Sequence, residues 1–226
     1  NDPLKMKHSV SINDRLNLLK KTLMLIFNSR WTLNQFTKGL NKKIFKNKLN
    51  IIHQSTNKKK INFKTKKKII IFVGRLNKSK GYDLFGKAVI NILNKFPDWN
   101  AIAIGDEPRE KIIFNHKRLK TLGFKNNNIV TNWFKKSDIS VVCSRIDEPF
   151  GRTALEASSA GCAVIISNKG GLPEASSSAI KIKNLSIRNL QKKIEKVINN
   201  EKYKKDLQKK IYKNFKLTNE LAAKKI

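Results

Sequence analysis

Short apolar runs alternate with helix-like stretches from residue 69 onward, and this alternation narrows the choice of folds. Four runs are predicted strands: Ile69–Val73, Ala101–Ile104, Ile139–Cys143 and Ala163–Ile166. Helices are expected between them near 83–95, 109–121 and 152–160. Strands that are apolar on both faces and alternate with helices are typical of βαβ units in a parallel sheet. The sequence therefore predicts an α/β fold with a Rossmann-like, doubly wound parallel sheet, which binds ligands beyond the carboxyl ends of its strands.

The residues before this region indicate a second α/β unit. The pattern predicts a helix from Asp14 to Lys21, a strand from Leu23 to Phe27, a helix capped by Asn28-Ser29 with Trp31, Phe36 and Leu40 on one face, and a strand from Leu49 to His53. The basic stretch 54–68 is interpreted as a linker. We therefore expect a first domain over 1–60, a larger domain over 61–205, and C-terminal helices over 206–226, the last near 219–226.

One segment combines two carboxylates with a glycine turn. Glu148 precedes the turn at Gly151, and Glu156 lies one turn into the helix that follows. The backbone amides of Gly151, Arg152 and Thr153 would be unpaired at the helix start, where they and the helix dipole favour an anion such as a phosphate. The two carboxylates would accept hydrogen bonds from hydroxyls. A nucleotide-sugar diphosphate, flanked by two sugars, fits this arrangement.

A second glycine loop, residues 74–81, follows the first strand of the larger domain. It begins at Gly74 and carries Arg75 and Lys80 toward the same crevice. Two cations beside a helix start suit a diphosphate leaving group, whose charge grows as the bond breaks. The alternative is that both are ordinary surface cations of a lysine-rich chain.

Other polar residues have simpler interpretations. Glu174 ends a further glycine loop, 167–174, and is expected either to cap the next helix or to reach the ligand. Gly105-Asp106 is expected to turn the chain, and Asp138 is interpreted as a turn or cap residue. Surface or packing positions are expected for all three histidines: His8, His53 and His116.

The composition is strongly basic, with 49 Lys and Arg against 16 Asp and Glu and a formal net charge of +33. Such a charge is typical of nucleic-acid binding, but the lysines are spread over the whole chain and the aromatic residues lie in apolar patterns. We therefore interpret the charge as a solvated surface, with an anionic membrane or nucleic acid as alternatives.

Several function classes find little support. The longest apolar run is about six residues, against the roughly 20 that span a membrane. No secretory signal is recognisable, so we expect a cytoplasmic protein. Cys143 and Cys162 lie in strand-like runs and are expected to be buried free thiols. The spacing of the cysteines and histidines predicts no metal site.

Three motifs in order make the chain resemble the retaining "group 1" glycosyltransferases of the two-Rossmann-domain (GT-B) type, with their E-x7-E motif. They are Gly74-Arg75-Leu76 with Lys80-Gly81-Tyr82-Asp83, then Glu148-Pro149-Phe150-Gly151 with Glu156, then Gly170-Gly171-Leu172-Pro173-Glu174. The resemblance is strong over residues 69–180 and weak over 23–56. It implies that only the last part of the first domain is present, and that the final helix crosses back toward it.

The resemblance also implies roles. Arg75 and Lys80 would hold the diphosphate of a nucleotide-sugar donor, and the amides of 151–153 would cradle it. Glu148 would contact the donor sugar as the catalytic carboxylate, and Glu156 would bind the ribose. The donor-binding set also includes Gly74 and Phe150, and no metal cofactor is expected.

The same resemblance implies sugar transfer with retention to a sugar or lipid-linked acceptor. It also implies a role in bacterial cell-surface polysaccharide or lipopolysaccharide synthesis, on the inner face of the membrane or free in the cytoplasm.

The sequence departs from the family pattern at two places. Val130-Thr131-Asn132 replaces the expected glycine-bearing strand end, and 132–138 is a short loop into the next strand. The alternatives are an epimerase or phosphorylase of the same architecture, a basic nucleic-acid-binding module, and a scaffold without catalysis.

Overall fold

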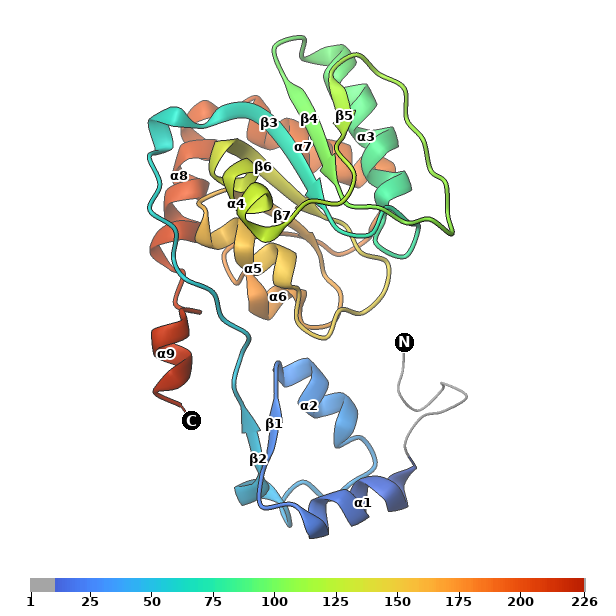
Figure 1. Cartoon of the computed structure of the whole chain (residues 1–226), viewed down its shortest axis with the longest axis vertical. Coiled ribbons are helices and arrows are strands. Elements are labelled where there is room, and N and C mark those ends of the chain that lie inside the picture. Colours follow the sequence, from blue (N-terminus) through green and yellow to red (C-terminus); the bar gives the residue numbers. More distant parts are fainter. Residues whose placement is uncertain (1–10, 226) are drawn as a thin grey trace.

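The computed structural model describes residues 11–225 and contains two parallel sheets (Figure 1). Along the chain its elements are α1 (Ile12–Lys21), β1 (Leu25–Phe27), α2 (Arg30–Phe36), η1 (Lys46–Lys48), β2 (Leu49–Ile51), η2 (Phe63–Thr65), β3 (Lys67–Val73), α3 (Tyr82–Lys95), β4 (Asn100–Ile104), β5 (Leu119–Thr121), α4 (Asn127–Lys136), β6 (Ser137–Val142), α5 (Arg152–Ser159), β7 (Ala163–Ser167), α6 (Leu172–Ala175), β8 (Ile180–Ile182), α7 (Ile187–Ile198), α8 (Glu201–Lys213) and α9 (Asn219–Ala223).

The larger sheet has six parallel strands in the order β5-β4-β3-β6-β7-β8. Figure 1 shows α4, α5 and α6 in front of this sheet and α3 and α7 behind it. Along the chain, the strands are added outward from β3 through β4 to β5, and the next strand, β6, then pairs with the other edge of β3. This reversal is the switch point at which doubly wound sheets bind ligands. The predicted α/β fold is confirmed.

The core explains why the strands read as continuous apolar runs. Both faces of the sheet are covered, so successive residues such as Ile70 and Ile71 in β3, or Val164 and Ile165 in β7, are all buried. The small residues Ala154 and Ala157 let α5 pack closely on β6 and β7. The loops that follow these strands are therefore held by a rigid frame.

The helix predicted at 109–121 is wrong. Residues 105–118 cross from β4 to β5 without a helix, and β5 occupies 119–121. Two tertiary contacts fix this path: the ring of Phe114 lies directly over Gly86 of α3, and Arg118 donates to the carbonyl oxygens of Phe96 and Trp99. Packing on α3 has overridden local propensity.

The prediction for residues 130–138 is also wrong. The sequence predicts a strand end at 130–132 and a loop at 132–138, but these residues lie largely in α4, a helix that it does not predict. The glycine near a strand end is Gly123, just beyond β5, whose carbonyl accepts a hydrogen bond from the amide of Gly105 (3.0 Å). The short strand β8 was also not predicted.

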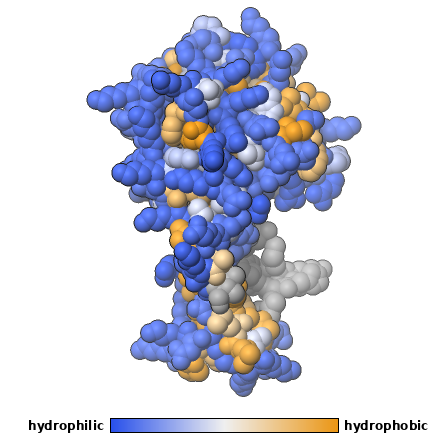
Figure 2. Space-filling model, turned by 60° about the vertical axis from the view of Figure 1, so that its left-hand side comes forward, coloured by the Kyte–Doolittle hydropathy of each residue, from blue (hydrophilic) through white to orange (hydrophobic). Residues whose placement is uncertain are grey.

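The N-terminal unit, residues 11–53, contains α1, α2 and the two-stranded parallel sheet β1-β2. These elements were predicted, although α2 ends at Phe36, so Leu40 lies beyond it. Large apolar side chains stay exposed on this unit, among them Leu23 (95% exposed) and Ile44. Figure 2 shows apolar side chains gathered on the lower part of the molecule, where this unit lies.

The linker and the C-terminal helices run back along the larger unit. The amide of Thr56 donates to the carbonyl oxygen of Leu217 (3.0 Å), and the amide of Lys59 donates to the carbonyl oxygen of Ser159 (3.1 Å). The last helix, α9, lines a small hollow with Ile52 and Ser55. The linker therefore packs against other parts of the chain and is held by hydrogen bonds. The domain boundaries at 60 and 205 stay predictions.

Among the described helices, none combines the length and the apolar character that a membrane span needs. Cys143 and Cys162 are buried free thiols, as predicted.

Candidate active site

Glycines bring the strand-end loops into direct backbone contact. A Cβ on Gly105 would lie 1.9 Å from the carbonyl oxygen of Gly74, and one on Gly81 would lie 2.0 Å from that of Cys143. Both glycines have positive φ values, +140° and +76°, which side chains rarely adopt. The loop 74–81 is thereby pressed against the loop that follows β6.

Lys80 and Glu148 meet where these two loops touch. The Nζ atom of Lys80 lies 2.5 Å from Oε1 of Glu148, and the two side chains are 24% and 12% exposed. The two loops that were predicted to line one crevice are thus in contact here, through a cation and a carboxylate. Each charge offsets part of the desolvation cost of the other.

The start of α5 follows Glu148 by four residues along the same loop. Gly151, at φ +112°, precedes the first helical residue, Arg152, and no side chain caps the helix. The Thr153 hydroxyl lies 3.4 Å from the carbonyl oxygen of Val73, which ties α5 to the end of β3. The uncapped amides of this first turn can donate to an anion.

Glu156 lies one turn further along α5, with its side chain 15% exposed and 2.9 Å from Nε of Arg152. Burial raises the pKa of this carboxyl above its ordinary value, although the Arg152 guanidinium pulls it the other way. A partly desolvated carboxylate is a strong acceptor for a hydroxyl.

Two predicted site residues are placed differently. Arg75 is exposed and, among the described residues, makes no ion pair or hydrogen bond, so nothing in the structure directs it toward Lys80. Phe150 is buried, and its ring lies 5.6 Å from that of His53. We assign Phe150 to the wall of the loop.

Glu174 caps a helix of the N-terminal unit and not the helix that follows it. Its carboxylate accepts hydrogen bonds from the amides of Arg30 (2.7 Å) and Trp31 (3.0 Å) at the start of α2, and it lies 3.0 Å from Nε2 of His53. Burial works to raise the pKa of Glu174, but these hydrogen bonds prevail and lower it. The sequence did not predict this role for either Glu174 or His53.

The remaining candidates are structural. Asp138 is not a turn residue, since it lies in β6 as a buried partner of Lys204 (2.8 Å) and Gln208 (2.8 Å). His116 lies 3.2 Å from Oδ1 of Asn94, and His8 lies outside the described residues. Within residues 11–225, no three His, Cys, Asp or Glu side chains are grouped as metal ligands.

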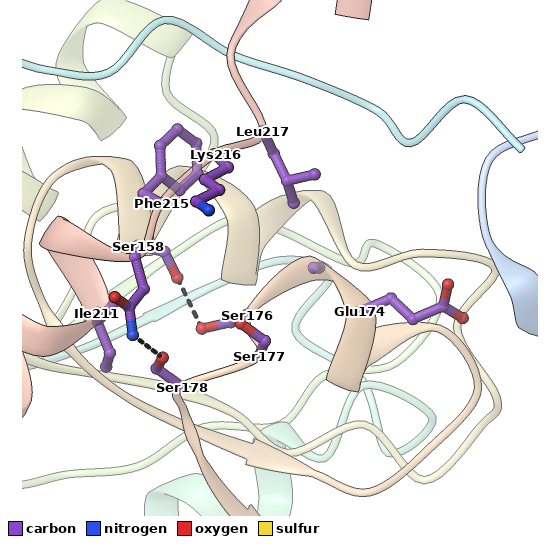
Figure 3. Close-up of a pocket in the computed structure, with 11 residues that line it drawn as sticks. Ser158, Glu174, Ser176, Ser177, Ser178, Ile211, Phe215, Lys216 and Leu217 are labelled. Carbon is purple, nitrogen blue, oxygen red and sulfur yellow. Dashed lines mark hydrogen bonds between the residues drawn. The ribbon is translucent and has the colours of Figure 1, made fainter. Parts of the chain in front are cut away.

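A separate cavity of about 190 Å³ lies between the region of α6 and residues 211–217. Its wall includes Ser158 and Ser176, whose hydroxyls are 2.8 Å apart. Figure 3 shows the Glu174 carboxylate pointing away from these serines. Glu174 lies at the edge of this cavity, but none of the residues predicted to bind the donor lines it.

The sequence of this chain is similar to those of known proteins. Residues 53–214 match the family described as "Glycosyl transferases group 1". The spore coat protein SA of Bacillus subtilis is 36% identical over 121 residues, which are 48% of this chain and 32% of that protein. The glycosyltransferase MJ1607 of Methanocaldococcus jannaschii is 35% identical over 128 residues, 51% of this chain and 32% of that protein.

Solved structures share the fold. HepE of Anabaena, determined with UDP and glucose, superposes with a TM-score of 0.76 at 16% identity, over 95% of this chain and 66% of that one. The C-terminal domain of the group 1 protein LpcC from Francisella tularensis gives 0.56 at 28% identity, over 66% of this chain and 85% of that one. The chain covers about a third of the length of the curated relatives. With its family matched over most of its length, the chain belongs to the group 1 glycosyl transferases.

Proposed function

We propose that this chain binds the nucleotide-sugar donor of a glycosyltransferase that transfers a sugar to an acceptor hydroxyl with retention of configuration. The observation that carries the proposal is the contact of Lys80 with Glu148 beside the uncapped start of α5. A cation, uncapped amides and a carboxylate on two touching loops match the diphosphate and the hydroxyls of such a donor.

The diphosphate is the leaving group, and its negative charge increases as the sugar departs. The amides of 151–153 and the helix dipole would stabilise this charge together with Lys80. Arg75, exposed on the same loop, would close on the diphosphate when the donor binds. In this proposal these groups neutralise the diphosphate, and no metal ion is needed.

The two carboxylates would bind the sugars on either side. Glu148 would accept hydrogen bonds from the donor sugar at the reacting end, and Glu156 from the ribose. The solved structures of HepE with UDP and with UDP-glucose support a donor of this class, because this chain shares their fold. We propose a sugar or lipid-linked acceptor and a cytoplasmic role in surface polysaccharide synthesis, which rest on the family resemblance.

Calorimetric titration tests the donor class. UDP, GDP, ADP, UDP-glucose and GDP-mannose would be titrated into the chain in salt high enough to suppress nonspecific attraction. We expect saturable 1:1 binding of one nucleotide and tighter binding of its sugar conjugate. If only duplex DNA bound, with an affinity that fell steeply with salt, the basic surface and not the crevice would be the functional site.

A further inference from the structure

The candidate donor loop, residues 148–153, is contacted by the N-terminal unit as well as by its own sheet. The Ser29 hydroxyl donates to the carbonyl oxygen of Pro149 (2.5 Å), and the His53 ring lies against Phe150. Glu174, which belongs to the larger unit, reaches in the opposite direction to α2 and His53. In Figure 3 its carboxylate points toward the N-terminal segment at the right-hand edge.

Glu174 supplies the negative charge that the start of α2 lacks. No acidic residue lies in the first turn of α2, although a negative charge is favoured there. Ser29 accepts a hydrogen bond from the amide of Thr32 (3.0 Å), and Glu174 accepts from the two amides before it. The N-terminal end of α2 is thus fully capped only when the N-terminal unit is seated on the larger unit.

The anchor of Glu174 is rigidly joined to the donor loop. The amide of Gly171 donates to the carbonyl oxygen of Glu148 (2.7 Å), and that of Gly170 donates to Oδ1 of Asp147 (2.9 Å). A Cβ on Gly171 would lie 2.5 Å from the carbonyl oxygen of Pro149. The loop is therefore held between this glycine pair on one side and Ser29 and His53 on the other.

We propose that Glu174 and His53 are positioning residues, which seat the N-terminal unit on the donor loop and so hold residues 148–153 in the conformation that binds a nucleoside diphosphate. This inference rests on the proposed function of the loop. It differs from a purely structural role, in which the same contacts would join the two units without affecting the loop.

Amide hydrogen exchange and UDP titration separate these roles. Glu174→Ala and His53→Ala would be compared with Glu174→Gln and His53→Gln, which keep part of the hydrogen bonding and serve if the alanine variants fold poorly. Ser11→Ala is the matched control, because Ser11 caps α1 in the same unit and has no described contact with the loop. Circular dichroism would confirm that each variant is folded.

We expect exchange at residues 148–153 to accelerate about tenfold in the alanine variants, less in the glutamine variants, and not in Ser11→Ala. The Kd for UDP should rise about tenfold in parallel, because only the fraction of molecules with the loop in the binding conformation can bind. Unchanged exchange in the loop would overturn the proposal, as would accelerated exchange with an unchanged Kd. If the unmodified chain binds no nucleotide, the proposed function fails, while the exchange data still decide whether Glu174 and His53 hold the loop.

Discussion

The Nζ atom of Lys80 lies 2.5 Å from Oε1 of Glu148, although 68 residues separate the two along the chain. The contact joins the loops that follow β3 and β6, which are neighbours where the strand order reverses. It holds both charges in place before a ligand arrives. It also means that a phosphate must compete with Glu148 for Lys80.

Because of this competition, we expect Glu148→Gln to affect the binding of UDP and the binding of its sugar conjugate differently. The variant should bind UDP as well as the unmodified chain or up to about fivefold more tightly, because Lys80 is released from a charge-assisted hydrogen bond. It should lose the extra affinity for the sugar conjugate, and transfer in the complete enzyme. Calorimetry with both ligands would check this, with Glu220→Gln on exposed α9 as the control of equal charge. A large loss of UDP affinity in Glu148→Gln would contradict the assigned role.

Glu156→Gln should stabilise the fold and weaken nucleotide binding. Because burial raises the pKa of Glu156 in the folded state, the unfolded chain ionises first as the pH rises, and ionisation lowers the free energy of unfolding. The variant should therefore gain roughly 1–3 °C in Tm at about pH 7, and this gain should disappear at about pH 3, where the carboxyl is protonated in both states. Thermal unfolding at the two pH values measures it, and an equal gain at both would argue against this cause.

The buried network of Lys204, Asp138 and Gln208 should support stability and not binding. Lys204→Ala removes one partner of a buried ion pair and should cost about 3–5 kcal/mol. Exposed Lys209→Ala on the same helix should cost less than about 0.5 kcal/mol. Urea unfolding of both variants provides the comparison. A small loss in Lys204→Ala would show that the pair is easily replaced.

The two thiols should be inert in the folded protein. Burial raises the pKa of Cys143 to about 12 and also raises that of Cys162, and only the thiolate reacts. We expect a disulfide reagent at about pH 8 to modify neither thiol until urea unfolds the chain, when both react. Rapid modification of one thiol under native conditions would show that its strand end opens.

The sheet was predictable because its strands are buried on both faces, which leaves an unmistakable apolar run such as 163–166. The path of 105–121 was not, because it depends on Phe114 meeting Gly86 and on Arg118 reaching three carbonyl oxygens in the last turn of α3 and just beyond it. Such contacts leave no local pattern in the sequence.

The site shows the same contrast. Lys80 and Glu148 could be placed together, since each follows a neighbouring strand of a parallel sheet. The contact of Glu174 with α2 and His53 could not, because it joins two units whose relative position no local pattern encodes. The missing acidic residue in the first turn of α2 was visible, but it did not identify the accepting carboxylate of Glu174, 144 residues away.

The most direct test of the account is the Kd for UDP, or for whichever nucleotide binds best, in Lys80→Ala and in Lys87→Ala. Lys87 is an exposed lysine of α3, so both variants lose one charge and only the first loses the crevice cation. We predict that Lys80→Ala weakens binding about 10- to 100-fold, as expected for a charged hydrogen bond, while Lys87→Ala leaves it unchanged. Equal affinity in the two variants would show that the diphosphate does not bind at Lys80.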